Sequence, residues 1–77
     1  AVCREHIIMK VGNGPASRQP VIEIANLFRA KVVNVAESRL MLELTGEPEK
    51  IDSFIGLLQP YGVKEIVRTG ISALERD

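Results

Sequence analysis

A chain of 77 residues is long enough for one domain, and a composition of 45% hydrophobic and 26% charged residues is typical of a folded globule rather than a disordered or fibrous segment. Ten basic and ten acidic side chains give a formal net charge of zero, so the basic excess expected of a nucleic-acid-binding protein is missing. One cysteine and one histidine exclude an internal disulfide and a closed structural zinc site, and no apolar run reaches the length of a membrane span, so we expect no metal, nucleic acid or membrane partner.

The first half of the chain predicts a strand, a helix and a second strand. The first strand is expected over residues 5–11, and its two faces carry Ile7, Met9 and Val11 on one side and His6, Ile8 and Lys10 on the other. A Gly-Asn-Gly-Pro loop over residues 12–15 ends it. Ser17 is the expected N-cap of a helix over residues 18–29, with Pro20 in its first turn. The apolar stripe of this helix follows the 3.6-residue period and consists of Val21, Ile24, Ala25 and Phe28.

The second half predicts a hairpin, a second helix and a last strand. Strands over residues 31–36 and 39–45 are separated by Glu37-Ser38, which is short enough for an antiparallel hairpin. A helix begins near Pro48 and ends before Pro60 and Gly62. Its apolar stripe consists of Ile51, Phe54, Ile55 and Leu58. The last strand is expected over residues 63–69 and ends at Gly70, and no structure is predicted for residues 71–77.

The expected order is therefore β-α-β-β-α-β, which predicts an α+β protein of the ferredoxin-like class, a sandwich of a four-stranded antiparallel sheet with both helices on one face. The helices would cover the sheet face that carries Leu40, Leu42 and Leu44. The opposite face would carry Ile8, Met41 and either Val33 or Ile66, which makes it unusually apolar for a face exposed to solvent. We expect another protein surface to cover this face, although scattered exposed apolar side chains also occur on monomers.

No pattern of reactive side chains predicts catalysis. Cys3 and His6 lack the spacing of a dyad on a strand, and the acidic residues at the start of the second helix fit the positive end of its dipole. The loop over residues 12–15 lacks a phosphate-binding pattern, which leaves a small anionic or amino-acid effector there as the alternative. No aromatic residue falls on the predicted strands, as base stacking by an RNA-binding sheet would require. The residues favour a protein-binding or effector-responsive module over an enzyme.

Three stretches then carry a resemblance to a known family, and they are residues 28–37 (FRAKVVNVAE), 42–55 (LELTGEPEKIDSFI) and 60–70 (PYGVKEIVRTG). They closely resemble the C-terminal domain of the small, regulatory subunit of acetolactate synthase, also called acetohydroxyacid synthase. The resemblance implies a single domain over residues 1–77, with the family's N-terminal ACT domain absent from this sequence.

The resemblance also implies a role in branched-chain amino acid biosynthesis. The chain would be a non-catalytic subunit that binds and activates the large catalytic subunit, which condenses pyruvate to acetolactate. Thiamine diphosphate, magnesium and FAD would belong to the large subunit, so this chain is expected to bind no cofactor. The family further implies pairing of small subunits into a homodimer, and a cytoplasmic location in bacteria or a plastid or mitochondrial one in eukaryotes. A stand-alone small-ligand sensor for amino acids, with the same ferredoxin-like fold, is the alternative function.

Exposed polar residues beside the matching stretches are the predicted contacts with the catalytic subunit: Arg29, Lys31, Lys64, Glu65 and Arg68. This prediction depends on position alone. Each residue also fits an ordinary solvated surface charge, whose ion pairs contribute about 0 to 1 kcal/mol.

Overall fold

The computed structural model describes residues 2–12, 14–35 and 39–73. Its elements in chain order are β1 (Val2–Val11), η1 (Pro15–Ser17), α1 (Arg18–Phe28), β2 (Lys31–Val35), β3 (Leu40–Gly46), α2 (Pro48–Leu58), η2 (Gln59–Tyr61) and β4 (Val63–Ala73). The short elements η1 and η2 are single 3-10 turns that lead into α1 and out of α2. The predicted β-α-β-β-α-β order is confirmed.

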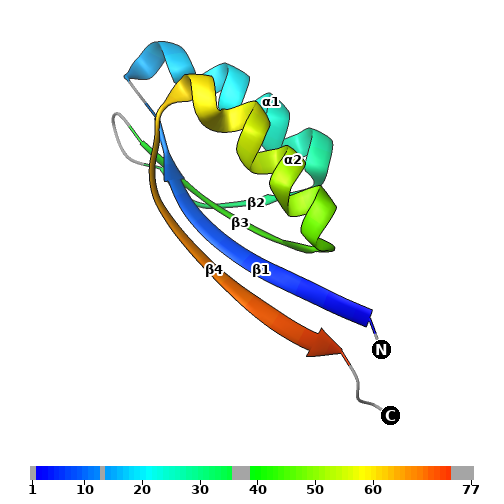
Figure 1. Cartoon of the computed structure of the whole chain (residues 1–77). Coiled ribbons are helices and arrows are strands. Elements are labelled where there is room, and N and C mark those ends of the chain that lie inside the picture. Colours follow the sequence, from blue (N-terminus) through cyan, green and yellow to red (C-terminus); the bar gives the residue numbers. More distant parts are fainter. Residues whose placement is uncertain (1, 13, 36–38, 74–77) are drawn as a thin grey trace.

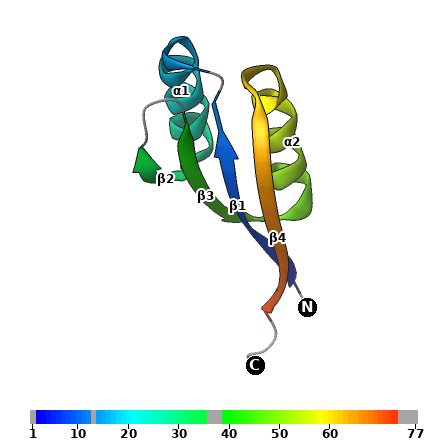
Figure 2. The same cartoon turned by 90° about the vertical axis from the view of Figure 1, so that its left-hand side faces the viewer.

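The strands form one antiparallel sheet in the order β2-β3-β1-β4. The first strand of each half of the chain, β1 and β3, therefore lies at the centre of the sheet, and these two strands pair with each other. Figure 1 and Figure 2 show α1 and α2 side by side on one face of this sheet, while the other face has no covering layer. This arrangement is the ferredoxin-like α+β sandwich expected from the order of elements.

The core lies between the helices and the covered sheet face. The described residues contribute eleven buried apolar side chains to it: Ile7, Met9, Val11, Val21, Ala25, Leu40, Leu42, Leu44, Ile51, Phe54 and Leu58. The rings of Phe28 and Phe54 have centroids 5.2 Å apart and are tilted by 57°, which joins α1 to α2 through an aromatic pair. The alternating strand residues and the two helix stripes therefore meet in one cluster, as their periods predict.

α1 begins at Arg18 as predicted but ends one residue earlier than predicted. Ser17 lies at the N-cap position but its side chain makes no capping hydrogen bond, because η1 runs directly into the helix and the Ser17 backbone is already helical (φ −82°, ψ −14°). The helix ends at Phe28 rather than Arg29. Arg29 is the C-cap, with a left-handed backbone (φ 59°) whose N–H donates to the carbonyls of the preceding turn.

The predicted end of the last strand at Gly70 is wrong. β4 continues to Ala73, because its last residues pair with the first residues of β1 in an unbroken antiparallel register from Val2↔Ala73 to Glu5↔Gly70. Pairing to a neighbouring strand, which no local pattern reveals, keeps the glycine inside the strand. The predicted hairpin turn Glu37-Ser38 lies outside the described residues, although β2 and β3 are antiparallel neighbours as expected.

The shape is elongated, with extents of 45 × 18 × 18 Å. β3 reaches only to Gly46, opposite Glu5, so the parts of β1 and β4 beyond that point form a two-stranded ribbon that projects past the helices (Figure 1). We refer to Val2–Arg4 and their partners Ile71–Ala73 as the terminal ribbon.

Candidate interaction surfaces

The open face of the sheet carries an apolar patch at its centre. Ile8 lies directly across from Val67 on β4, and Met41 follows on the β3 side of the same face. These three side chains line a shallow groove of about 150 Å³, and the side chain of Val67 is 61% exposed. We call Ile8, Met41 and Val67 the open-face patch.

Of the two alternatives predicted as a third apolar member of this face, Ile66 lies elsewhere and Val33 falls in an irregular part of β2. Ile66 is paired with Met9, a core residue, so it points to the helix side, where it remains 40% exposed at the sheet edge. Val33 lies in a bulge, because the register of β2 shifts between Val32 and Asn34. The prediction of Ile8 and Met41 is confirmed, whereas Ile66 must be replaced by Val67.

Polar cross-strand pairs flank the open-face patch. The Lys10 ammonium lies 3.0 Å from a Glu65 carboxylate oxygen, on the side toward the start of β4. On the other side, the His6 Nε2–H donates to Glu43 Oε2 over 2.6 Å. An apolar centre with a polar rim is the usual arrangement of a protein-protein contact. The sheet therefore presents a surface suited to a protein partner.

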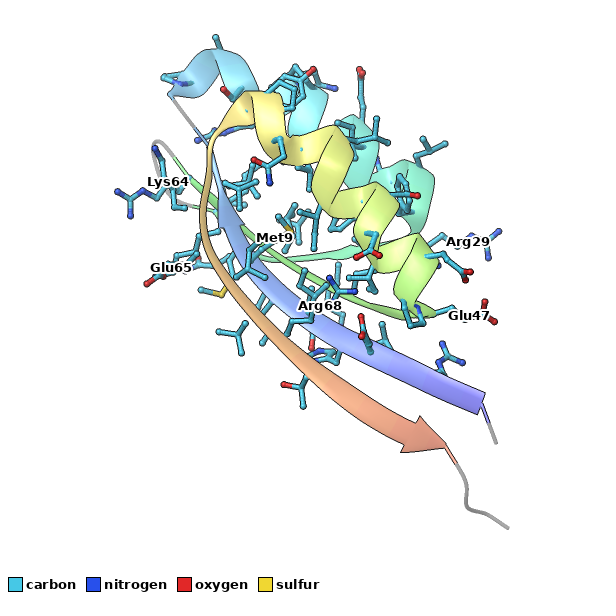
Figure 3. All side chains as sticks on the ribbon, in the orientation of Figure 1. Met9, Arg29, Glu47, Lys64, Glu65 and Arg68 are labelled. Atoms are coloured by element: carbon cyan, nitrogen blue, oxygen red, sulfur yellow. The ribbon has the colours of Figure 1, made fainter. Side chains whose placement is uncertain are left out.

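The structure does not bring the five predicted contact residues together. Arg29 and Lys31 lie where α1 gives way to β2, at one edge of the sheet, whereas Lys64 and Glu65 lie at the start of β4 on the other edge. Figure 3 shows Arg29 at one end of the molecule, near Glu47, and Lys64 and Glu65 at the opposite end. One flat partner surface that touches all of them would have to span the whole domain.

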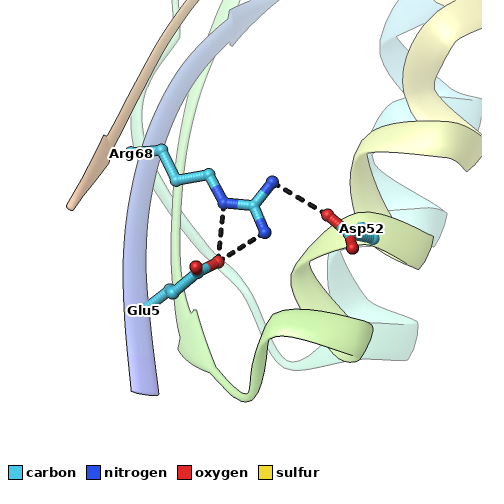
Figure 4. A network of polar contacts seen from close by, with 3 residues as sticks. All are labelled: Glu5, Asp52 and Arg68. Carbon is cyan, nitrogen blue, oxygen red and sulfur yellow. Dashed lines mark hydrogen bonds and ion pairs between the residues drawn. The ribbon is translucent and has the colours of Figure 1, made fainter. Parts of the chain in front are cut away.

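Arg68 is held within the fold. Its Nε donates to Glu5 Oε1 over 2.6 Å, Nη2 bonds the same carboxylate, and Nη1 lies 2.8 Å from Asp52 Oδ1 (Figure 4). The hydrogen bond that Arg68 donates to Glu5, followed by the one that it donates to Asp52, raises the pKa of Arg68 above its ordinary value. These contacts join β4 to β1 and α2, so the guanidinium has a structural role; its contact with a partner stays a prediction.

A groove at the Arg29 end contains a cation that the sequence argument missed. It has a volume of about 370 Å³ and is lined by Arg29, Lys31, Glu43, Leu44, Thr45 and Lys50. Lys50 was not among the predicted contacts, because it lies among acidic residues at the start of α2 that fit the helix dipole. No local sequence signal identifies it, because its place in the groove depends on how β3 and α2 meet in the fold.

The loop before α1, where a small effector was the alternative, forms no cavity large enough for one, and the described residues form no metal site. The pocket at the start of α1, lined by Gly12, Gly14, Ser17 and Arg18 among others, has a volume of about 10 Å³, room for about one water molecule. Within the described ranges, no three His, Cys, Asp or Glu residues lie close enough to hold a metal ion. No helix there is long and apolar enough to cross a membrane.

Comparison with known proteins gives consistent matches. The family model described as the small subunit of acetolactate synthase matches residues 4–77. The acetolactate synthase small subunit of Mycolicibacterium smegmatis is 42% identical over 76 residues, which cover 99% of this chain and 45% of the relative. The corresponding Bacillus subtilis protein is 44% identical over 75 residues, or 97% of this chain and 44% of the relative.

A solved structure agrees with the sequence matches. The crystal structure of the acetolactate synthase small subunit from Thermotoga maritima superposes with a TM-score of 0.81 at 29% identity, over 97% of this chain and 48% of that one. The chain spans a little under half the length of each of these relatives.

Proposed function

Because the chain belongs to the family of acetolactate synthase small subunits, we propose that it is a non-catalytic regulatory domain that binds the large catalytic subunit and raises its production of acetolactate. The observation that carries this proposal is the match of the family model to residues 4–77. The proposal assigns thiamine diphosphate, magnesium and FAD to the catalytic subunit, and it places the pair in the cytoplasm of a bacterial host.

The geometry supports binding to a protein in preference to chemistry on a small molecule. The open-face patch is apolar, flanked by polar pairs and uncovered. The described residues of the domain converge on no site where a nucleophile, a base and an orienting group meet, which acyl-transfer chemistry would need. A domain of this kind changes a reaction by contact with the subunit that performs it.

The test is a reconstitution. The chain is added to the purified catalytic subunit of the same organism, and acetolactate formation and co-elution are measured, with the intact small subunit as positive control. We expect co-elution and a higher rate. No co-elution and no change in rate, where the intact small subunit activates, would contradict the proposal. Saturable heat on titration of the chain alone with valine, leucine or isoleucine would instead support the amino-acid sensor.

We also propose that the open-face patch is covered by a second copy of the chain. Val67 is the most exposed member of the patch, so a charge at this position would be buried without a partner on pairing. Light scattering should show a dimer for the unaltered chain and a monomer for Val67→Glu. Leu57→Glu is the matched control, because Leu57 is 48% exposed on α2, on the opposite side of the domain. A monomeric unaltered chain would contradict the pairing.

A further inference from the structure

The groove lined by Arg29, Lys31, Lys50, Glu43, Leu44 and Thr45, which we call the basic groove, lies where four elements meet. They are the end of α1, the start of β2, the end of β3 and the first turn of α2. Its three cations thus come from three different elements. Their convergence on one groove is a product of the tertiary fold and has no counterpart in the local sequence.

The cations of the basic groove have no partner within the described residues. The ion pairs of the described chain involve His6, Lys10 and Arg68, and none involves Arg29, Lys31 or Lys50. The single carboxylate of the groove belongs to Glu43, which already accepts the hydrogen bond from His6. The groove therefore holds three positive charges against one carboxylate.

Local stability does not explain two of these cations. Arg29 is the only described residue other than glycine with a positive φ, at a helix end where glycine is the usual residue. A positive charge is favourable at the C-terminal end of α1. A basic residue one position earlier would supply the same charge without requiring a left-handed backbone. Lys50 lies in the first turn of α2, where the helix dipole disfavours a cation.

The stem of Lys50 is seated on the strand end. A Cβ built on Gly46 would lie 3.0 Å from the Cδ of Lys50, so the aliphatic part of the lysine packs over a position that carries no side chain. Gly46 is buried although it is the last residue of β3, and the Lys50 stem lies against it. The lysine is thereby kept beside Arg29 and Lys31 along the groove.

We propose that the basic groove binds an acidic segment of the catalytic subunit, whose Asp or Glu carboxylates pair with Arg29, Lys31 and Lys50. The argument is charge complementarity, since unpaired cations that share a groove favour a ligand with several carboxylates. The inference rests on the proposed function and deepens it, because it names the surface and the chemistry of the contact. It also selects the Arg29 and Lys31 end over the Lys64 and Glu65 end as the place of contact.

The test compares two double charge reversals. Lys31→Glu with Lys50→Glu alters the groove, and Arg18→Glu with Arg39→Glu makes the same change in charge at exposed cations that lie outside it and outside the predicted contacts. Binding to the catalytic subunit is measured by calorimetry, and circular dichroism checks that each variant is folded. We expect the groove variant to bind at least about tenfold more weakly and the control to change by less than about threefold. Added NaCl should weaken the unaltered chain more than the groove variant.

The outcomes separate this inference from the proposed function. If the unaltered chain binds and the groove variant binds equally well, the inference is overturned and the proposed function stands. Equal weakening of binding in both variants also overturns it, because the loss of affinity would then follow from the change in net charge and would not depend on the groove. If the unaltered chain does not bind, the proposed function fails and the inference fails with it.

Arg29→Gly gives a second and independent readout. Glycine adopts the left-handed backbone of this position without strain, so the variant should melt at the same or a higher temperature. The loss of the guanidinium should nevertheless weaken binding to the catalytic subunit about threefold or more. Unchanged affinity would contradict the role assigned to Arg29 in the groove.

Discussion

The two faces of the sheet are built from the same strands but differ in what contacts them. On the covered face, Ile7 and Leu42 are fully buried beneath the helices, while on the open face their chain neighbours Ile8 and Met41 remain in part exposed to solvent. Successive side chains of a strand point to opposite faces, so each strand serves both surfaces at once. One face thus holds the domain together and the other is left open to solvent, and mutations on the two faces should have separable effects.

The largest expected effect on stability is at the centre of the covered face. Phe54→Ala should lower the free energy of unfolding by about 3 to 5 kcal/mol, because it removes a fully buried ring and its contact with Phe28. Urea unfolding followed by circular dichroism measures the change. Leu57→Ala, an exposed position on the same helix, is the control and should change it by less than about 0.5 kcal/mol.

The comparison between faces is sharpest at two adjacent residues of β3. Leu42→Ala should cost about 2 to 5 kcal/mol of unfolding free energy, since Leu42 is fully buried beneath the helices. Met41→Ala, one residue away and on the open face, should cost less than about 1 kcal/mol when both substitutions are made in the monomeric Val67→Glu variant. A similar cost at both positions would show that the open face is not free of packing in solution.

Substitutions of glycine should have opposite signs inside α2 and just after η2. Gly56 is exposed inside the helix and a Cβ there meets no atom within 4 Å, so Gly56→Ala should stabilise the chain by about 0.5 to 1 kcal/mol. Gly62 has a φ of 87°, so Gly62→Ala should destabilise it by about 1 kcal/mol. Thermal melts of the two variants give the signs directly.

The smallest effect is expected at the ion pairs of Arg68. Arg68→Gln should lower stability modestly, and a cycle with Glu5→Gln should show that the two residues are coupled. The pKa of Arg68 is raised in the folded state, so its contribution is complete below the pKa of the unfolded chain and is lost only as the pH rises through the raised value. The difference between Arg68→Gln and the unaltered chain should therefore stay constant from about pH 6 to about pH 9. A strong dependence in this range would contradict the assignment.

Periodicity was sufficient to predict the covered face. The apolar stripes of residues such as Val21 and Phe54, and the alternation of Ile7 and Leu42, each occur within one element, and burial follows from them. The strand order then follows from short connections between elements. These features depend on neighbours in the chain, which is why a sequence alone reveals them.

Features that depend on pairing between distant segments were missed. The extension of β4 past Gly70 needs β1 as its partner, and the exchange of Ile66 for Val67 on the open face depends on the register between these strands. The basic groove joins Arg29, Lys31 and Lys50 from three elements, so only the first two were among the predicted contacts. Arg68 was chosen as an exposed charge, yet its partners Glu5 and Asp52 come from other parts of the chain.

The terminal ribbon has a mechanical consequence. Val2 and Ala73 are paired with one another, so the start of β1 and the end of β4 lie side by side (Figure 1). A force that pulls Val2 and Ala73 apart would break the hydrogen bonds between β1 and β4 one after another. This is the unzipping geometry, in which the bonds do not share the load as they would in shear. The ribbon should peel at low force, and the resistance should rise where Glu5 and Arg68 tie the strands to α2 through Asp52.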